Sequence, residues 1–300
     1  MNFASMLFTA LLVLQAGLVV TGGAVRLTGS GLGCPTWPEC TDGSIRPVIT
    51  QAEDQLHAWI EFGNRLIAWL ILILALAALI YVVKKLKNRS DFKRLRLLVV
   101  LQILGFLGQV VLGGITVLTK LNPISVSAHF VLTLPLIAGA LALRHRVLDR
   151  PVVSLKPMTR KLTITVTTLT FIVLLFGVLV TGTGPHAGDQ AAPRYNFDVR
   201  MVTWLHADLV IALCGAILAL YLLLKLAPIS TSPESRDNHL KLMKTFIFLV
   251  LIQGGIGYLQ YFTGVPAILV GLHLLGLSLV WLTACKLLIR TSSKRDSKLA

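Results

Sequence analysis

The feature that most constrains this chain is a series of long segments with almost no charged residue. A helix that crosses the hydrocarbon core of a bilayer needs about 20 mostly apolar residues, because only the helix itself can satisfy backbone amides there. Hydrophobic residues make up 55% of the 300 positions and charged residues only 14%, which excludes an ordinary water-soluble domain. The apolar segments are residues 1–25, 66–83, 97–119, 121–143, 162–188, 201–224 and 245–285.

The last apolar segment is 41 residues long and is interrupted at Gly264, Val265 and Pro266. At about 1.5 Å per residue it is twice as long as the bilayer core is thick, which predicts two helices joined by a turn. We therefore expect an all-α integral membrane protein with eight transmembrane helices. The first segment lacks a basic region before it and is longer than the apolar part of a signal peptide, so we expect it to be retained.

The basic residues are distributed unevenly between the loops. The net charge of +15 would suit a nucleic-acid partner, but 22 of the 28 Lys and Arg residues lie in segments 84–96, 144–161 and 225–244 and in the tail from residue 286. This is the pattern of cytoplasmic loops under the positive-inside rule. The sequence thus predicts a multi-pass protein of the cell membrane with both termini in the cytoplasm, and no nucleic-acid partner.

The chain repeats itself after four helices. The motif Gly17-Leu-Val-Val-Thr-Gly22 recurs as Gly177-Val-Leu-Val-Thr-Gly182. Because four crossings return the chain to its starting side, the two halves have the same orientation, with a pseudo-twofold axis along the membrane normal. We predict two tandem four-helix bundles, residues 1–150 and 151–300.

Three histidines lie inside predicted helices, and ionisable groups there are functional candidates because they are costly in a bilayer. His129 and His273 each follow a glutamine by 20 residues, and these two histidines and His206 share one depth near the outer edge. A single membrane histidine usually makes a hydrogen bond to a neighbouring helix, but repetition at one depth favours axial ligation of a haem in a four-helix bundle. His206 and His273, from one half, predict a bis-histidine haem site.

The first half lacks a matching second histidine on its second helix, so we expect it to form an open substrate site. That helix carries His57, Glu61, Asn64 and Arg65. Glu61 and Arg65 are four residues apart and could form a local ion pair. Alternatively, Glu61 moves protons or stabilises a cationic intermediate.

Two cysteines, Cys34 and Cys40, lie in the first outer loop, on the oxidising side of the membrane. This location predicts a disulfide, for which a structural role is favoured over a redox role. The Cys-x-x-Cys-His motif of c-type haem attachment is absent from the sequence.

These motifs together resemble the haem A synthase family over essentially the whole chain. The resemblance rests on the loop Thr-Gly-Ser-Gly-Leu-Gly-Cys-Pro-Thr-Trp-Pro-Glu-Cys ending at Cys40, on the Glu-x-x-x-Arg of the second helix and on the three helix histidines. The loop motif is specific, whereas the histidines alone would fit several b-type cytochromes. The resemblance implies a two-half, eight-helix enzyme that oxidises the C8 methyl group of haem O to a formyl group, with a bound haem b as electron relay.

The resemblance also implies residue roles and partners. His206 and His273 match the haem b ligands, His129 matches a ligand of the substrate haem O, and Glu61 matches the catalytic glutamate. Cys34 and Cys40 match the cysteine pair of the loop. The implied partners are an enzyme that produces haem O and the assembling terminal oxidase that receives haem A, with an unknown electron donor.

The chain departs from the family pattern at two places. Asn64 stands where better-known members have a histidine three residues after the glutamate, and loop 183–199 lacks a second cysteine pair. The substrate iron then has one protein ligand, or another group such as His57 replaces the second; we expect Asn64, Arg65 and His57 on the substrate side. An open position suits oxidation chemistry, because an iron held by two imidazoles cannot bind oxygen. Our hypothesis is that His129 holds haem O from one side while Glu61 lies near the methyl group.

Two other functions compete with this interpretation. A di-haem b protein would transfer electrons, for example from a quinol, without changing either haem. A transporter would also be built from paired halves, although the sequence shows no obvious broken helix at the midplane.

Overall fold

The computed structural model describes residues 2–150, 152–226 and 233–292. These ranges contain eight long helices, each long and apolar enough to cross a membrane, which confirms the predicted multi-pass membrane protein. The helices are α1 (Phe3–Leu27), α2 (Gln55–Lys85), α3 (Phe92–Leu118), α4 (Pro123–Val147), α5 (Pro157–Thr183), α6 (Val199–Leu226), α7 (Pro233–Phe262) and α8 (Ala267–Ile289).

Helix α2 begins well before the uncharged segment 66–83 from which it was predicted. The Asp54 carboxylate caps its first turn by accepting hydrogen bonds from the backbone N–H groups of Leu56 and His57. The polar residues between the cap and the apolar segment are therefore helical, and they place the candidate residues of the first half on a regular helix.

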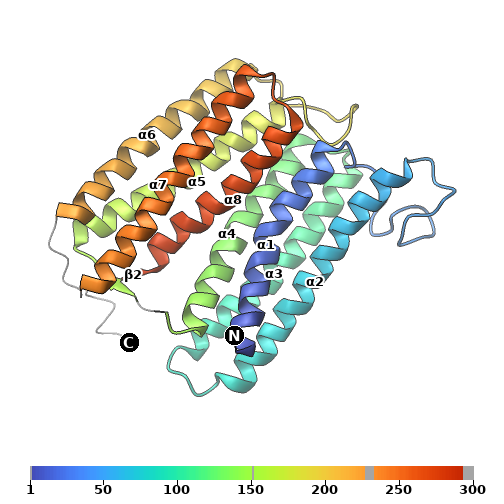
Figure 1. Cartoon of the computed structure of the whole chain (residues 1–300). Helices are drawn as coiled ribbons and strands as arrows, with labels where there is room; N and C mark the ends of the chain where they lie inside the picture. Colours follow the sequence, from blue (N-terminus) through green and yellow to red (C-terminus); the bar gives the residue numbers. More distant parts are fainter. Residues whose placement is uncertain (1, 151, 227–232, 293–300) are drawn as a thin grey trace.

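The helices form two neighbouring groups of four (Figure 1). In each group, every helix contacts the next one in the chain, and the first contacts the fourth, so α1 meets α4 and α5 meets α8. Contacts between the groups involve α1, α4, α5 and α8. This arrangement is compatible with two tandem four-helix bundles, although the functional division of the chain at residue 150 stays a prediction.

Buried apolar side chains fill the inside of each group and the seam between the groups. Phe8 and Leu95 belong to the cluster of the first group, and Phe246 belongs to that of the second. Across the seam, the Trp281 indole N–H of α8 donates to the Leu134 carbonyl of α4 at 2.8 Å. The hydrogen bond matters because apolar burial gives little driving force between helices in lipid, where close packing and polar contacts hold them together.

Besides the helices, the described residues form one short parallel β-ladder. Strands β1 (Val153–Ser154) and β2 (Thr291–Ser292) pair in parallel, and the Val153 N–H donates to the Arg290 carbonyl at 2.7 Å. The ladder lies at the end of the molecule where α1 begins and α8 ends (Figure 1). We call this the basic end, since loops 84–96 and 144–161 lie there, and we call the opposite end, with the loop of Cys34, the disulfide end.

Candidate functional site

The three candidate histidines lie near the disulfide end, one each on α4, α6 and α8. Each is the seventh or eighth residue of its helix, roughly 10 Å from a helix start at that end. Each ring lies against a glycine of the preceding helix, because a Cβ at that glycine would be 3.3–3.5 Å from the ring Cε1. The pairs are His129 with Gly113, His206 with Gly177 and His273 with Gly257.

These glycines give space to the imidazoles. A Cβ at 3.3–3.4 Å would be tighter than most contacts of real side chains, so a larger residue at Gly177 or Gly113 would displace the ring. The repeated motifs contain glycines at these positions, but the sequence alone did not connect them with the histidines. The signal was present, since Gly113 and Gly257 both lie four residues after the repeated glutamines.

The ring nitrogens of these histidines are mostly uncommitted to protein partners. His206 Nδ1 lies 3.0 Å from the Val173 carbonyl oxygen, and because a carbonyl only accepts, Nδ1 carries the proton. Its Nε2 lone pair is then available to a metal ion, which is the usual arrangement of a ligating histidine. In the described structure, Nδ1 of His129 and Nδ1 of His273 are buried without a hydrogen-bond partner. His206 and His273 are close enough to interact electrostatically.

These observations fit a haem ligand set in the second half. Two neighbouring imidazoles come from facing helices, each against a glycine, with ring nitrogens left free for an iron atom. His129 belongs to the first half and has no second histidine at its level on α2. The two halves therefore differ in the number of histidines that they place at this level.

Glu61 forms the local ion pair that was one of its two interpretations. Its Oε1 accepts a hydrogen bond from the Arg65 guanidinium at 2.7 Å, and its Oε2 accepts one from the Cys34 backbone N–H at 2.8 Å. The residue is only 6% exposed, although it lies close to the disulfide end of α2. Both carboxylate oxygens are thus held, one by α2 itself and the other by the disulfide loop.

Arg65 fastens the disulfide loop to α2. Besides Glu61, its guanidinium donates to the carbonyls of Glu39 and Cys34 at 3.1 Å and of Thr36 at 3.3 Å. The predicted disulfide between Cys34 and Cys40 is confirmed, and both cysteines are fully buried. Arg65 thus contacts both sides of the small closed loop, a role that its spacing from Glu61 did not predict.

The disulfide loop also reaches the helix behind His129. The Trp37 indole lies against Gly114 of α3, where a Cβ would be 2.6 Å from the Trp37 Cδ2 atom. The preceding residue, Gly113, is the one that faces His129. The adjacent glycines of α3 therefore accommodate two different rings, and the loop covers the region from Glu61 to the neighbourhood of His129.

Asn64 is held by the first helix. The Thr21 hydroxyl donates to the Asn64 Oδ1 atom at 2.8 Å. One turn before Thr21, Gly17 has no atom within 4 Å of the position that a Cβ would take. Gly17 is the repeat counterpart of Gly177, which faces His206, so the first half has open space where the second half has an imidazole.

His57 lies in the first turn of α2, about two helical turns closer to the disulfide end than Asn64. Its backbone contacts the loop, since a Cβ at Gly33 would be 2.5 Å from the His57 carbonyl carbon. The structure thus brings Glu61, Asn64 and Arg65 near the loop and α1, and places His57 beyond them.

Polar contacts join the two halves at the disulfide end. The Arg26 guanidinium of α1 donates to the carbonyls of Thr181 and His186. Within the second half, His186 Nε2 donates to the Val265 carbonyl at 2.8 Å. The Tyr195 hydroxyl, from the loop before α6, donates to the Pro123 carbonyl at 3.0 Å. The outer loop of the second half is thus fixed to the first half by hydrogen bonds in place of a second disulfide.

Comparisons with known proteins identify a family and several relatives of this chain. A family described as cytochrome oxidase assembly protein, COX15-CtaA, matches residues 5–285. The chain is similar to a heme A synthase of Shewanella oneidensis, with 37% identity over 161 residues, which are 50% of this chain and 46% of that protein. A heme A synthase of Geobacillus kaustophilus is 34% identical over 112 residues, 37% of this chain and 32% of that protein.

A third relative, a heme A synthase of Bacillus pumilus, is 32% identical over 145 residues, which cover 48% of this chain and 45% of that protein. The chain thus aligns with about a third to a half of the length of these relatives. The family match is much longer and includes every candidate residue described above.

Proposed function

The chain belongs to the COX15-CtaA family of cytochrome oxidase assembly proteins, and from this premise we propose that it is a haem A synthase. The proposed reaction oxidises the C8 methyl group of haem O to a formyl group, and the haem A produced goes to a terminal oxidase. The observation that carries the proposal is the set of three glycine-backed histidines beside a buried, loop-bound glutamate. The name heme A synthase of several relatives supports it.

In the proposed second-half site, His206 and His273 would hold haem b through their imidazoles. When bound, haem b would supply the electron relay that connects the substrate site with an external redox partner. The hydrogen bond from His206 Nδ1 to the Val173 carbonyl fixes the ring orientation, and Gly177 and Gly257 let the two rings lie close to the neighbouring helices. These contacts support a permanently bound cofactor.

In the proposed first-half site, His129 would hold the substrate haem O. Asn64 is not a second ligand in this proposal, because its Oδ1 already accepts the Thr21 hydroxyl hydrogen. The open space at Gly17 then lies on the side without an imidazole. Arg65 acts through the loop that it holds, and His57 lies too far toward the disulfide end to replace the missing ligand.

Glu61 is the proposed proton acceptor. With water as the oxygen source, conversion of the methyl to a formyl group (R–CH3 + H2O → R–CHO + 4 H⁺ + 4 e⁻) releases four protons and four electrons, so the site needs a group that takes protons and a route by which electrons leave to an external oxidant. Glu61 Oε1 and Oε2 are held by Arg65 and by the Cys34 N–H, which fixes the carboxylate at the level of the histidines. The disulfide loop covers Glu61 on that side, since Glu61 is only 6% exposed, both cysteines are fully buried and the Trp37 ring lies against α3.

The proposed orientation places the basic end in the cytoplasm and the disulfide end outside the cell membrane. The concentration of Lys and Arg in the loops of the basic end supports this, as does a disulfide at the opposite end. The haem O-producing enzyme and the terminal oxidase would then meet the protein within the membrane.

Mass analysis of the bound haems tests the proposal. The full chain is expressed with a haem O supply and purified, and its haems are extracted and identified by mass. Haem A together with haem b is the expected result. Haem b alone, with haem O unchanged, would point to the electron-transfer protein, and a preparation without haem would point to a transporter.

A further inference from the structure

Four cations from both halves gather at the basic end of the seam. Arg144 lies in the last turn of α4 and Arg150 follows that helix, whereas Lys286 lies in the last turn of α8 and Arg290 follows it. Lys286 is close enough to Arg144, Arg150 and Arg290 for electrostatic repulsion, and Arg144 likewise repels Arg150. We call these four residues the seam cluster.

The β-ladder fixes the seam cluster in place. Val153, three residues after Arg150, donates its N–H to the Arg290 carbonyl and pairs with Thr291. This pairing ties the linker that follows α4 to the end of α8. The ladder therefore holds the segments of Arg150 and Arg290 together, while the packing of α4 against α8 places Arg144 and Lys286.

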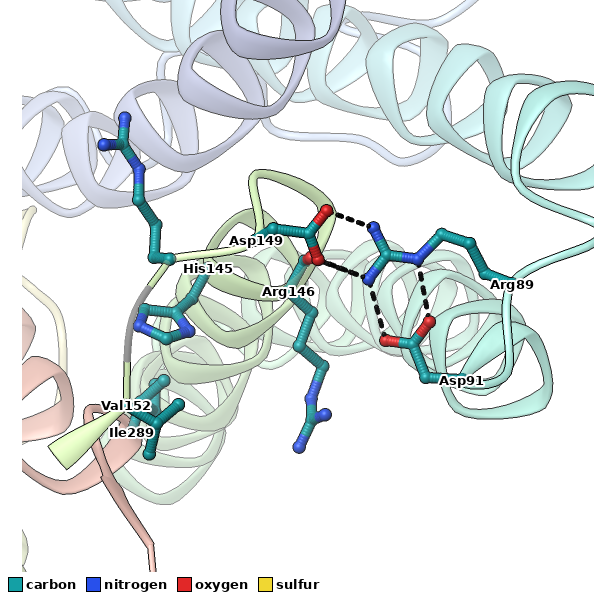
Figure 2. A pocket seen from close by; sticks show the side chains of 8 residues that line it. Arg89, Asp91, His145, Arg146, Asp149, Val152 and Ile289 are labelled. Carbon is teal, nitrogen blue, oxygen red and sulfur yellow. Dashed lines mark hydrogen bonds and ion pairs between the residues drawn. The ribbon is translucent and has the colours of Figure 1, made fainter. Parts of the chain in front are cut away.

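The carboxylates that line the adjoining pocket already form ion pairs with another residue. Asp91 and Asp149 both bind the Arg89 guanidinium, at 2.9 Å and 2.8 Å, on the wall of a pocket of about 200 Å³ (Figure 2). The hydrogen bond to Asp91 is the main cause that raises the pKa of Arg89. Within the described part of the chain, no member of the seam cluster forms an ion pair with a carboxylate, and the Arg144 guanidinium donates to the neutral Thr9 hydroxyl at 2.8 Å.

The helix ends do not balance this charge. A helix C-terminus carries about half a negative charge, so the ends of α4 and α8 together offset only about one of the four positive charges. An anion between the two helices would relieve the remaining repulsion. The ends of membrane-spanning helices lie at the depth of lipid headgroups, where phosphate esters are abundant, and basic pockets between such helices bind anionic headgroups.

We propose that the seam cluster is a binding site for a phosphate group, supplied by the headgroup of an anionic phospholipid. The phosphate lies between the cations of α4 and α8. The adjoining pocket, whose lining includes Arg150, Val152 and Ile289, receives the rest of the headgroup. Since two cations come from each half, the bound lipid links the halves at the basic end, as the hydrogen bonds of Arg26 and Tyr195 do at the disulfide end.

Native mass spectrometry of the purified full chain tests the site. The protein is delipidated in detergent and titrated with phosphatidylglycerol or with phosphatidylcholine. We expect one phosphatidylglycerol per chain to bind at least about tenfold more tightly than phosphatidylcholine. The double variant Arg150→Gln/Lys286→Gln should lose this preference, whereas Arg150→Lys/Lys286→Arg, which keeps the charges, should retain most of it.

A matched control removes two charges from the same end of the molecule but outside the seam. The double variant Lys84→Gln/Lys93→Gln changes two exposed residues of α2 and α3 and should change the affinity for phosphatidylglycerol less than about twofold. Equal losses in the control and in the seam variant would overturn the proposal, because diffuse surface charge would then explain binding. Equal affinity of the unmodified protein for phosphatidylglycerol and phosphatidylcholine would also overturn the proposal.

Inorganic phosphate distinguishes the two sources of the ligand. If millimolar phosphate displaces the lipid from the unmodified protein but has no effect on the residual binding of the seam variant, the site recognises phosphate itself and free phosphate is a ligand. If phosphate does not displace the lipid, the headgroup and chains contribute and the lipid is the ligand. Either result supports the phosphate site.

Discussion

The two halves of the molecule carry the same glycine and threonine pattern on their first helices but place different side chains against it. In the second half, the His206 ring lies against Gly177, and the Thr181 hydroxyl donates back to the Gly177 carbonyl at 2.7 Å. In the first half, the Thr21 hydroxyl reaches Asn64, and the space beside Gly17 is open. The two halves therefore differ in what faces the first helix at this position, an imidazole in the second half and open space in the first, although both first helices carry the same motif.

The largest expected effect comes from Glu61, the buried carboxylate of the first half that the disulfide loop binds. Glu61→Gln keeps the shape of the side chain but removes its ability to take a proton, so conversion of haem O to haem A should fall by about 10²- to 10⁴-fold. The ratio of the two haems, measured by mass after a fixed reaction time, gives the result. Glu39→Gln is the matched control, because Glu39 lies in the disulfide loop that binds Glu61 but its own carboxylate binds the Gly43 N–H. Full conversion of haem O in Glu61→Gln would show that Glu61 has no part in the mechanism.

Removal of a histidine should affect one half at a time. His206→Ala and His273→Ala should each lower the haem b content by about 10- to 100-fold, because a lost ligand costs at least as much as a lost outer partner. His129→Ala should leave haem b in place and weaken only the retention of haem O. Absorption spectra and extracted haems of the three purified variants report these contents. Loss of haem b in His129→Ala would mean that the halves do not hold their haems independently.

Asn64→His should make the first half resemble the second. A second imidazole facing His129 would fill the space at Gly17, so the variant should retain haem O about tenfold more tightly and convert it more slowly. A gain of low-spin character in the absorption spectrum would report the added ligand. Asn64→Ala adds no iron ligand and should leave the absorption spectrum unchanged. An unchanged spectrum in Asn64→His would refute the proposed position of residue 64 opposite His129.

The smallest expected effect is a difference in haem b binding between substitutions at Gly177 and Gly17, which occupy equivalent positions in the two halves. Gly177→Ala places a Cβ 3.3 Å from the His206 ring and should weaken haem b binding about threefold, less than the tenfold loss of a missing outer partner. Gly17→Ala meets no atom within 4 Å and should leave haem b binding as it is. Titration of the haem-free proteins with haem b measures both affinities. If Gly17→Ala weakened haem b binding as much as Gly177→Ala, the contrast between the halves would disappear.

The sequence predicted the features that depend on composition and spacing. The eight spans follow from the lengths of the apolar segments, and the pair of Cys34 and Cys40 follows from their shared outer loop. The ion pair of Glu61 and Arg65 follows from the four-residue spacing on a helix. Each of these depends on residues that are near one another in the chain.

Contacts between distant segments could not be predicted in the same way. The position of Trp37 against Gly114 and the hydrogen bond of Thr21 to Asn64 depend on how a loop and two helices meet in space. The pairing of Val153 with Thr291 joins segments that are separated by four helices. No periodic pattern marks such contacts, because each depends on the packing of a single pair of side chains or on a short stretch of backbone.

The hydrogen bond between Trp281 and Leu134 has a consequence for electron flow. It fastens α8, which carries His273, to α4, which carries His129, and the two helices pack directly against each other. If both histidines hold haems, the separation of the two iron atoms is set by a rigid contact between neighbouring helices. Tunnelling between the haems would then occur over a constant distance, so the rate of electron transfer would follow the redox potentials of the haems and would not depend on a motion of one half relative to the other.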